Sequence, residues 1–290
     1  MEKIFKKNVI KRMSAYSNSE LTVAVHNGVF HADDVYSIAL LDVLAKVCNF
    51  TLKVIRTRDE QVIANADMRV DVGMKYSEET LDFDHHQNDT NLIQEEGIKH
   101  AAFGLLCQWC LTEEFLKIFK PKYILGLEHQ DNTGATHAKY ASIGHFIHAF
   151  LPSYEETVSF DEMFYEALAV ASTILERCIS TTLGLIKSEK DVEKAISEVL
   201  ADGKVIVMKK RIIIQQFLHP DWKFVISPDP TGGGWGFLGM NGQLLNPEFR
   251  GLTPETLAQK GYRGIFTHKA GFTGILESKD EAIKLCLTSL

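Results

Sequence analysis

An alternation of short apolar segments with polar and helical segments constrains the fold of this chain most strongly. Leu21–Val25 is short and apolar, and it predicts a buried strand. The polar segment His26–Asp34 follows it, and Val35–Val47 then has apolar residues at helical spacing. Leu52–Arg56 and Met68–Val72 predict two further strands. Strands that alternate with helices predict an α/β fold, in which helices cover both faces of a parallel sheet.

A change of pattern after this region marks a boundary between two domains. The helical segments end in Asp202-Gly203, a dipeptide typical of turns, and short strand candidates separated by proline and glycine follow. Helices are predicted at 99–119, 121–130, 160–187, 189–201, 253–260 and 279–289, and strands at Val205–Met208, Ile212–Ile214, Phe224–Ile226, Trp235–Met240 and 264–267. The predicted organisation is an N-terminal extension (1–20), an α/β domain (21–187), a linker helix (188–203) and a smaller α+β domain (204–290).

Composition narrows the class of protein. The chain has 290 residues, of which 45% are hydrophobic, so a large core can form. The formal net charge of −7 argues against a non-catalytic nucleic-acid coat protein, but it allows an enzyme with a local basic cleft. No apolar run approaches the length of a membrane span, and residues 1–20 lack the apolar segment of a signal peptide. We therefore expect no membrane association and a cytoplasmic location, and organellar targeting by residues 1–20 stays open.

Clusters of histidine and aspartate lie at or just past the ends of the predicted apolar segments. Because ligands of open parallel sheets bind outside the carboxyl ends of the strands, we expect these clusters to meet at one edge of the sheet. A single aspartate after a strand is often a helix cap, but this combination is hard to obtain from capping alone. The clusters are His26-Asn-Gly-Val-Phe-His31-Ala-Asp33-Asp34, Asp71 in Val70-Asp71-Val72-Gly73, Asp82-Phe-Asp84-His85-His86, and Glu128-His-Gln-Asp131.

Six residues of these clusters are candidate metal ligands. Carboxylates suit Mg²⁺ and Mn²⁺, and added imidazoles shift the preference toward Mn²⁺. Six ligands exceed the need of one catalytic zinc ion but suit two ions that share a carboxylate, as in phosphoryl displacement. We therefore predict two divalent cations, with Mn²⁺ as the first choice and Mg²⁺ as the second. The candidate ligands are His26, His31, Asp33, Asp71, His85 and Asp131. Cys107 and Cys110 form a lone C-x-x-C and are expected to be buried rather than to bind zinc.

The order of these motifs resembles the DHH phosphoesterase superfamily. At finer detail HNGVFHADD, RTRD, VDVG, DFDHHQ and the C-terminal HKAGFTG look like the melanocyte-proliferating-gene (UPF0160) type of metal-dependent exonuclease, over most of residues 21–290. The resemblance implies a DHH-type parallel-sheet domain followed by a substrate-binding domain. The superfamily usually has aspartate in place of His31, with one residue fewer before it, so the metal preference of this chain can differ.

The resemblance also implies roles for individual residues. Asp71 would bridge both ions, His85 would bind one of them, and Asp131 would complete the shell of the second. His86 would face the phosphate, and Asp84 would orient a histidine. The catalytic candidates are His86, His268 and Asp71, and the substrate-binding candidates are Arg56, His86, Gly233, Gly234 and His268.

Some of these substrate-binding assignments have simpler alternatives. Arg56 and Arg58 follow a predicted strand and could hold a nucleic-acid backbone, although a solvated charge is the preferred interpretation of Arg58. Gly233 and Gly234 could belong to an ordinary turn. His268 has no obvious core role and is the better candidate in the second domain.

The function that fits best is hydrolysis of phosphodiester bonds in short or single-stranded RNA or DNA by a two-metal nuclease. One alternative is a hydrolase of small phosphates such as pyrophosphate or dinucleotides. Another is a metal-dependent binding protein without catalysis. The expected partner is a nucleic acid or nucleotide, and the sequence leaves oligomerisation open.

Overall fold

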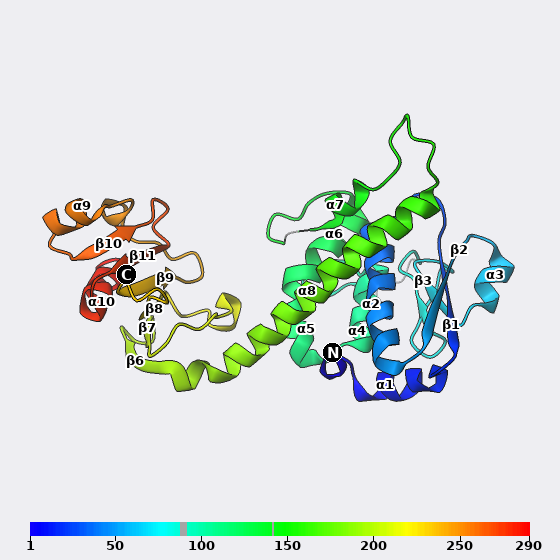
Figure 1. Cartoon of the computed structure of the whole chain (residues 1–290), viewed down its shortest axis with the longest axis horizontal. Coiled ribbons are helices and arrows are strands. Elements are labelled where there is room, and N and C mark those ends of the chain that lie inside the picture. The colour runs from blue at the N-terminus through cyan, green and yellow to red at the C-terminus, as the bar shows by residue number, and fades with distance from the viewer. Residues whose placement is uncertain (88–91, 141) are drawn as a thin grey trace. The chain divides into compact units, whose positions relative to one another are not determined.

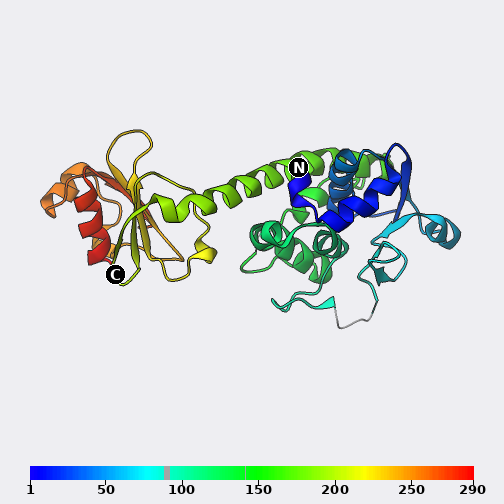
Figure 2. The same cartoon turned by 90° about the horizontal axis from the view of Figure 1, so that it is seen from below.

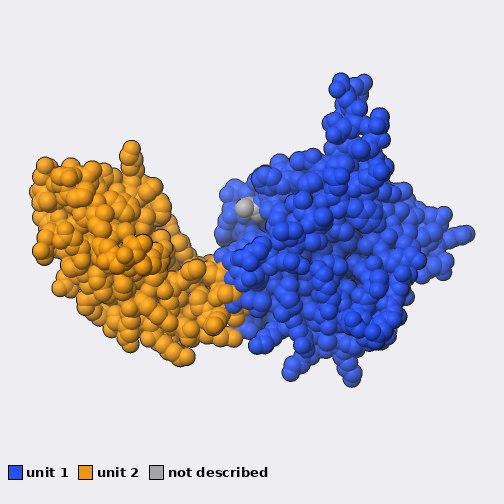
Figure 3. Space-filling model, in the orientation of Figure 1, with its two compact units in different colours: residues 1–183 blue, residues 184–290 orange. Residues whose placement is uncertain are grey.

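The computed structural model describes residues 1–87, 92–140 and 142–290 and divides into two compact units, Met1–Leu183 and Gly184–Leu290 (Figures 1 and 3). The division falls within the long helix α8 (Phe160–Ala195), a few residues before the boundary drawn from the sequence. Each unit has its own sheet and its own core, and each is described by itself.

The sheet of the first unit has the strand order β2-β1-β3-β5-β4. The strands are β1 (Glu20–Val25), β2 (Thr51–Arg56), β3 (Met68–Val70), β4 (Tyr76–Ser77) and β5 (Asp82–Phe83). The neighbours β2, β1, β3 and β5 run parallel. This agrees with the parallel sheet predicted for the first three, which helices connect. The edge strand β4 is antiparallel to β5, so the sheet is mixed. Neither β4 nor β5 was predicted, because strands of two residues carry no periodicity.

Helices α2 (Ala32–Cys48) and α3 (Glu60–Asn65) are the connections between the parallel strands. α2 is buried along almost all of its length, which agrees with the apolar composition of its sequence. Ala24 of β1 packs against Ile63 of α3 and against Ala66, which directly follows that helix. Both connections therefore pack against the sheet.

Further helices complete the first unit. They are α1 (Lys7–Met13), α4 (Ala102–Cys110), α5 (Glu113–Phe119), α6 (Leu125–Thr133) and α7 (Gly144–His148). The predicted helix 99–119 is broken after Cys110, where Leu111 is extended and bridges Phe5. Residues 1–20, expected to be an extension outside the fold, pack on it, and Ile4, Val9 and Met13 are buried. Cys107 and Cys110 are buried, which confirms the prediction.

Among the described residues, α8 is one helix that is long and apolar enough to cross a membrane by length and composition. This corrects the expectation that no apolar run approaches that length. The core helix of a soluble protein passes the same test, and α8 buries a helically spaced stripe that includes Phe164, Ala171 and Ile179. The expected lack of membrane association stays a prediction.

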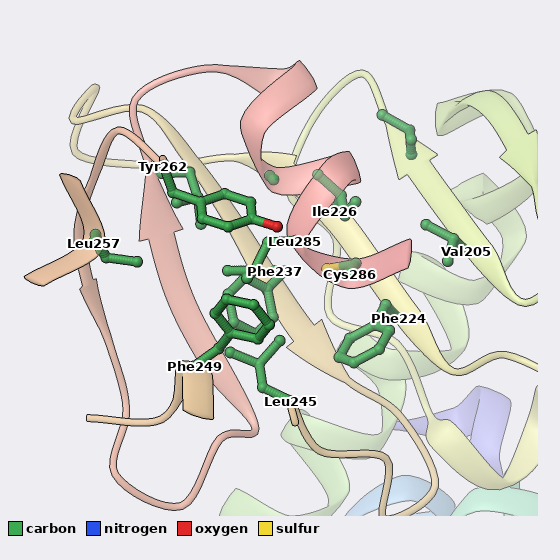
Figure 4. Packing of buried hydrophobic residues seen from close by; sticks show 13 residues of the cluster. Val205, Phe224, Ile226, Phe237, Leu245, Phe249, Leu257, Tyr262, Leu285 and Cys286 are labelled. Atoms are coloured by element: carbon green, nitrogen blue, oxygen red, sulfur yellow. The ribbon is translucent and has the colours of Figure 1, made fainter. Parts of the chain in front are cut away.

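The sheet of the second unit has the order β10-β11-β9-β8-β7-β6. Its elements are β6 (Ile196–Leu200), β7 (Val205–Met208), β8 (Phe224–Pro228), β9 (Trp235–Gly239), α9 (Pro254–Gln259), β10 (Gly264–Thr267), β11 (Thr273–Leu276) and α10 (Lys279–Thr288). α9 and α10 lie on one face of the sheet (Figure 2). Phe224, Ile226 and Phe237 of the sheet meet Leu285 and Cys286 of α10 in the core (Figure 4).

Two predicted elements of the second unit differ from the structure. The predicted helix 189–201 ends at Ala195, because the following residues form β6 and pair with β7. The segment Ile212–Ile214 is not a strand, and Ile212 and Ile214 pack instead against the core around Met208. Pairing and burial decided both cases, and neither is visible in local sequence.

Candidate metal centre

The register of the first sheet brings the histidine and aspartate clusters together. Val25 of β1 pairs with Val70 of β3, so His26 and Asp71 leave neighbouring strands at the same level. Val70 also pairs with Phe83 of β5, which places Asp84 beside Asp71. The first three clusters therefore meet at the carboxyl edge of the sheet, as predicted, and Asp131 of the fourth joins them from α6.

Asp71 lies between two histidines. Its Oδ2 is 3.1 Å from Nε2 of His26, and its Oδ1 is 3.4 Å from Nε2 of His85. The backbone of Asp71 has a φ of 52°, in the left-handed region that non-glycine residues seldom adopt. Strained backbone of this kind occurs often at functional sites, because the surrounding structure must hold it there. The two oxygens of one carboxylate thus face two different groups of ligand atoms.

The second group gathers around His85. Nε2 of His85 lies 3.3 Å from Oδ2 of Asp131, on α6, and 3.9 Å from Oδ2 of Asp33, on the first turn of α2. The backbone N–H of Ala102 donates to the same oxygen of Asp33 at 3.3 Å. Within the described part of the chain, Asp33 Oδ1, Asp71 Oδ1 and His85 Nδ1 are buried and make no hydrogen bond. Buried polar atoms without partners point to a ligand that the protein binds here.

The structure brings all six predicted ligands into groups whose ligand atoms lie within 4.8 Å of one another. Among the described residues these groups are His26, His31 and Asp71; Asp71, His85 and His86; and His31, Asp33 and Asp131. Asp71 and His31 each belong to two groups. The donor set of carboxylates and imidazoles, without sulfur, fits Mn²⁺ or Mg²⁺.

The pKa values of several residues in this cluster are shifted from their ordinary values. Burial raises the pKa of Asp33 well above its ordinary value, and repulsion from Asp71 and Asp131 adds to the effect. Burial also acts on His26 and lowers its pKa, but hydrogen bonds and charge from Asp34 and Asp71 outweigh it and raise the pKa to about 10. For Asp71 burial is likewise outweighed, because His26 and His85 lower its pKa. A bound cation would relieve the repulsion among these carboxylates.

Asp84 holds His86 at the edge of the cluster. Oδ1 of Asp84 lies 2.7 Å from Nδ1 of His86, and its Oδ2 accepts a hydrogen bond from the backbone N–H of Met74 at 2.6 Å. The side chain of His86 is 52% exposed and lies 3.5 Å from Oδ1 of Asp71. Asp84 thus orients a histidine, and that histidine remains accessible to a substrate.

A pocket of about 570 Å³ opens beside the cluster. Its lining includes His26, His31, Asp71, His86, Arg58 and Arg69. Nη2 of Arg58 lies 3.4 Å from Nδ1 of His26. The predicted substrate-binding residue Arg56 does not line this pocket, because its side chain is 2% exposed, stacks on Phe164 and pairs with Asp161. The structure therefore places Arg58, rather than Arg56, where a phosphate could meet it.

Two acidic residues that the sequence did not single out are buried near or beside the predicted ligands in the chain, and one of them contacts a ligand directly. Oδ2 of Asp34 lies 3.1 Å from Nε2 of His26, on the same nitrogen that faces Asp71. Glu128 is fully buried, and it accepts hydrogen bonds from Gln94 and from the backbone N–H of Ala101 and pairs with His100. Both stood inside the predicted clusters, but their burial was not visible in the sequence.

The remaining substrate-binding candidates lie in the second unit. His268 is exposed, and its Nδ1 accepts a hydrogen bond from the backbone N–H of Ala270. Gly234 has a φ of 134°, and a Cβ there would lie 2.1 Å from the backbone oxygen of Leu276, so this position requires glycine for the fold. Gly233 belongs to the same turn. Roles of Gly233, Gly234 and His268 in substrate binding stay predictions.

The fold and the cluster define a class of mixed α/β protein that carries a histidine–aspartate site at the ends of its strands. The chain belongs to the family described as Uncharacterised protein family (UPF0160), whose model matches residues 22–114 and 123–290. This confirms the resemblance to the UPF0160 type, and membership of the DHH superfamily stays a prediction.

Several proteins named MYG1 are similar in sequence to this chain. The MYG1 protein C694.04c of Schizosaccharomyces pombe is 27% identical over 328 residues, which cover 94% of this chain and 98% of that protein. A MYG1 protein of Chlamydia trachomatis is 33% identical over 163 residues, 54% of this chain and 53% of that protein. The MYG1 exonuclease of Mus musculus is 40% identical over 65 residues, 22% of this chain and 17% of that protein. No solved structure matches this chain.

Proposed function

We propose that this protein is a metal-dependent nuclease that hydrolyses phosphodiester bonds in short or single-stranded RNA or DNA. The observation that carries the proposal is the carboxylate of Asp71, whose two oxygens face His26 and His85 in separate ligand groups. A shared carboxylate of this kind suits two divalent cations. Relatives that are named exonucleases support the substrate class.

The residues present fit the two ions. His26, His31 and Asp71 would hold one ion, with Mn²⁺ preferred over Mg²⁺. Asp33, Asp71, His85 and Asp131 would hold the other, because His85 Nε2 lies near a carboxylate oxygen of each of these aspartates. His85 and Asp131 would then share one ion, whereas the resemblance implied one ion for each. When bound, such ions supply positive charge and an activated water for attack on phosphorus. We propose on this basis that the first unit is a DHH-type phosphoesterase domain.

Two side chains of the pocket would bind the phosphate groups of the substrate. His86 is accessible beside Asp71, and hydrogen-bonded Asp84 fixes its orientation, so it can donate to a phosphate oxygen. Arg58 is exposed in the pocket and can pair with a neighbouring phosphate. Both groups would stabilise negative charge on the substrate.

Incubation with labelled single-stranded RNA and DNA, pyrophosphate and cyclic dinucleotides would test the proposal, in Mn²⁺ and in EDTA. We expect shortening of the oligonucleotides in Mn²⁺ and none in EDTA. Cleavage of the small phosphates alone would replace the nuclease with a small-phosphate hydrolase. Binding of oligonucleotide without cleavage, under the same conditions, would indicate a non-catalytic binding protein.

A further inference from the structure

A second pocket, of about 260 Å³, borders the candidate metal centre. His31 lines both this pocket and the larger one described above, and Asp131 also lines the second pocket. The metal centre is therefore open to two separate cavities. A chain-like substrate cut at the centre needs space on both sides of the reacting phosphate.

The second pocket presents imidazoles from α7. His145 and His148 are both exposed and both line it, and the ring centre of His148 lies 5.9 Å from that of His31. Within the described residues neither belongs to a group of close metal-ligand atoms. The pair is thus better suited to a ligand with hydrogen-bond acceptors than to a third cation.

Gln130 adds an independent sign of a ligand. It is 8% exposed and lines the same pocket, and its Oε1 has no hydrogen-bond partner among the described residues. Its Nε2 lies 2.7 Å from Nδ1 of His145, so a neutral His145 carries its proton on Nε2. Gly144 makes room for this amide, because a Cβ there would lie 2.5 Å from Oε1. A buried, unpaired acceptor costs free energy unless a ligand satisfies it.

The hydrogen-bonding groups of the second pocket define the chemistry of a ligand that could bind there. The imidazole N–H groups need acceptors, which phosphate oxygens supply, and Gln130 Oε1 needs a donor, which a sugar hydroxyl supplies. Ala32 and Leu127 give the pocket an apolar wall. The volume lies below the roughly 300–1,000 Å³ of ordinary ligand pockets, so it suits a fragment of a larger substrate.

We propose that Gln130, His145 and His148 form a subsite that binds the sugar and phosphate of the nucleotide next to the cleaved bond. The proposal rests on the proposed function and deepens it, because it requires a substrate of at least two nucleotides. Pyrophosphate bound at the metal centre has no sugar, so it could not supply the hydroxyl that this subsite requires.

The test compares the variant His145→Ala/His148→Ala with the wild type in Mn²⁺. One substrate is a 5′-phosphorylated dinucleotide, and the other is bis(p-nitrophenyl) phosphate, a phosphodiester without sugar. We expect the KM for the dinucleotide to rise about tenfold or more, since hydrogen bonds to charged groups are lost. The kcat for the dinucleotide and the turnover of bis(p-nitrophenyl) phosphate should stay within about twofold of wild type. The single variant His148→Gln, which keeps an N–H donor at this position, should bind the dinucleotide more tightly than the double variant does.

Phe146→Ala is the matched control, because Phe146 lies on the same helix, is 71% exposed and does not line the pocket. An unchanged KM for the dinucleotide in the double variant would overturn the subsite, and so would an equal loss with both substrates. If the wild type hydrolyses neither substrate, the proposed function fails, and calorimetry of dinucleotide binding then decides the subsite separately. Equal binding by the wild type and the double variant would overturn it.

Discussion

Nε2 of His26 lies 3.1 Å from Oδ2 of Asp71, although the two residues follow different strands. Parallel pairing of Val25 with Val70 produces this proximity, because it aligns the ends of β1 and β3. The contact uses one oxygen of Asp71 and leaves Oδ1 directed toward His85. The predictions on metal binding follow from this division of one carboxylate.

Replacing Asp71 with asparagine should abolish metal binding at the shared position while keeping the fold. Asparagine tolerates the left-handed φ of 52° about as well as aspartate, so the backbone need not move. We expect the number of Mn²⁺ ions bound per chain to fall. Turnover should fall by more than about 100-fold, because about 100-fold is the largest loss expected for a residue that only orients a metal ligand.

The control for this variant is Asp202→Asn. Asp202 is exposed in the second unit and also has a φ of 52°. It should bind Mn²⁺ and turn over substrate as the wild type does. Full Mn²⁺ binding by the Asp71→Asn variant, measured by calorimetry, would remove Asp71 from the metal centre.

Divalent cations should stabilise the folded protein. Burial raises the pKa of Asp33, and repulsion from neighbouring carboxylates raises it further. A bound cation would relieve that repulsion. At Mn²⁺ concentrations about 100 times the Kd, binding should add about 2.7 kcal/mol to the free energy of unfolding. Denaturation in Mn²⁺ and in EDTA measures the difference, which should shrink in Asp33→Asn. Equal stability in both conditions would argue that the cluster binds no cation.

Gly104→Ala should destabilise the first unit. A Cβ at Gly104 would lie 1.6 Å from Oε1 of Glu128, and this carboxylate cannot move away freely because Gln94, His100 and Ala101 hold it. We expect a loss of about 1–3 kcal/mol in the free energy of unfolding, as for other overpacked interiors. Urea denaturation followed by circular dichroism provides the measurement.

Gly184→Ala is the opposite case and serves as the control. It lies within α8, and nothing surrounds its position within 4 Å. Alanine there should raise helix stability by up to about 1 kcal/mol. If both alanine variants behaved alike, the packing of Gly104 against Glu128 would not be the cause of either effect.

Asp82 should make stability depend on pH. Burial raises its pKa, but hydrogen bonds from Thr80, Arg69 and Lys75 outweigh burial and lower it below the ordinary value. A lowered pKa in the folded state means that the contribution is present above the unfolded pKa of about 3.9 and is lost as the pH falls. The free energy of unfolding should therefore drop between about pH 5 and about pH 2.

The Asp82→Asn variant isolates this contribution. Its stability should be lower than that of the wild type at neutral pH and should fall less steeply in acid. Urea denaturation at a series of pH values measures both slopes. Parallel slopes for the two proteins would show that Asp82 does not contribute to acid sensitivity.

The sequence identified the candidate ligands of the metal centre but little of their surroundings. His26, His31, Asp33, Asp71, His85 and Asp131 could be identified as candidates because strand periodicity and side-chain chemistry are local properties. Roles that depend on burial could not be identified in this way. Arg56 and Arg58 have the same charge and stand two positions apart, yet only Arg58 lines the pocket.

The sequence by itself determined the order of strands and helices around β1–β3, the types of the candidate ligand side chains and the family. Tertiary structure alone decided that residues 196–200 form β6 instead of extending a helix, since β7 supplies the hydrogen bonds. It alone also buried Glu128 against His100 and placed His145 and His148 in a pocket that Asp131 lines. The physical reason is the same throughout: periodicity acts between neighbours in the chain, whereas pairing, burial and the meeting of charges depend on residues far apart in it.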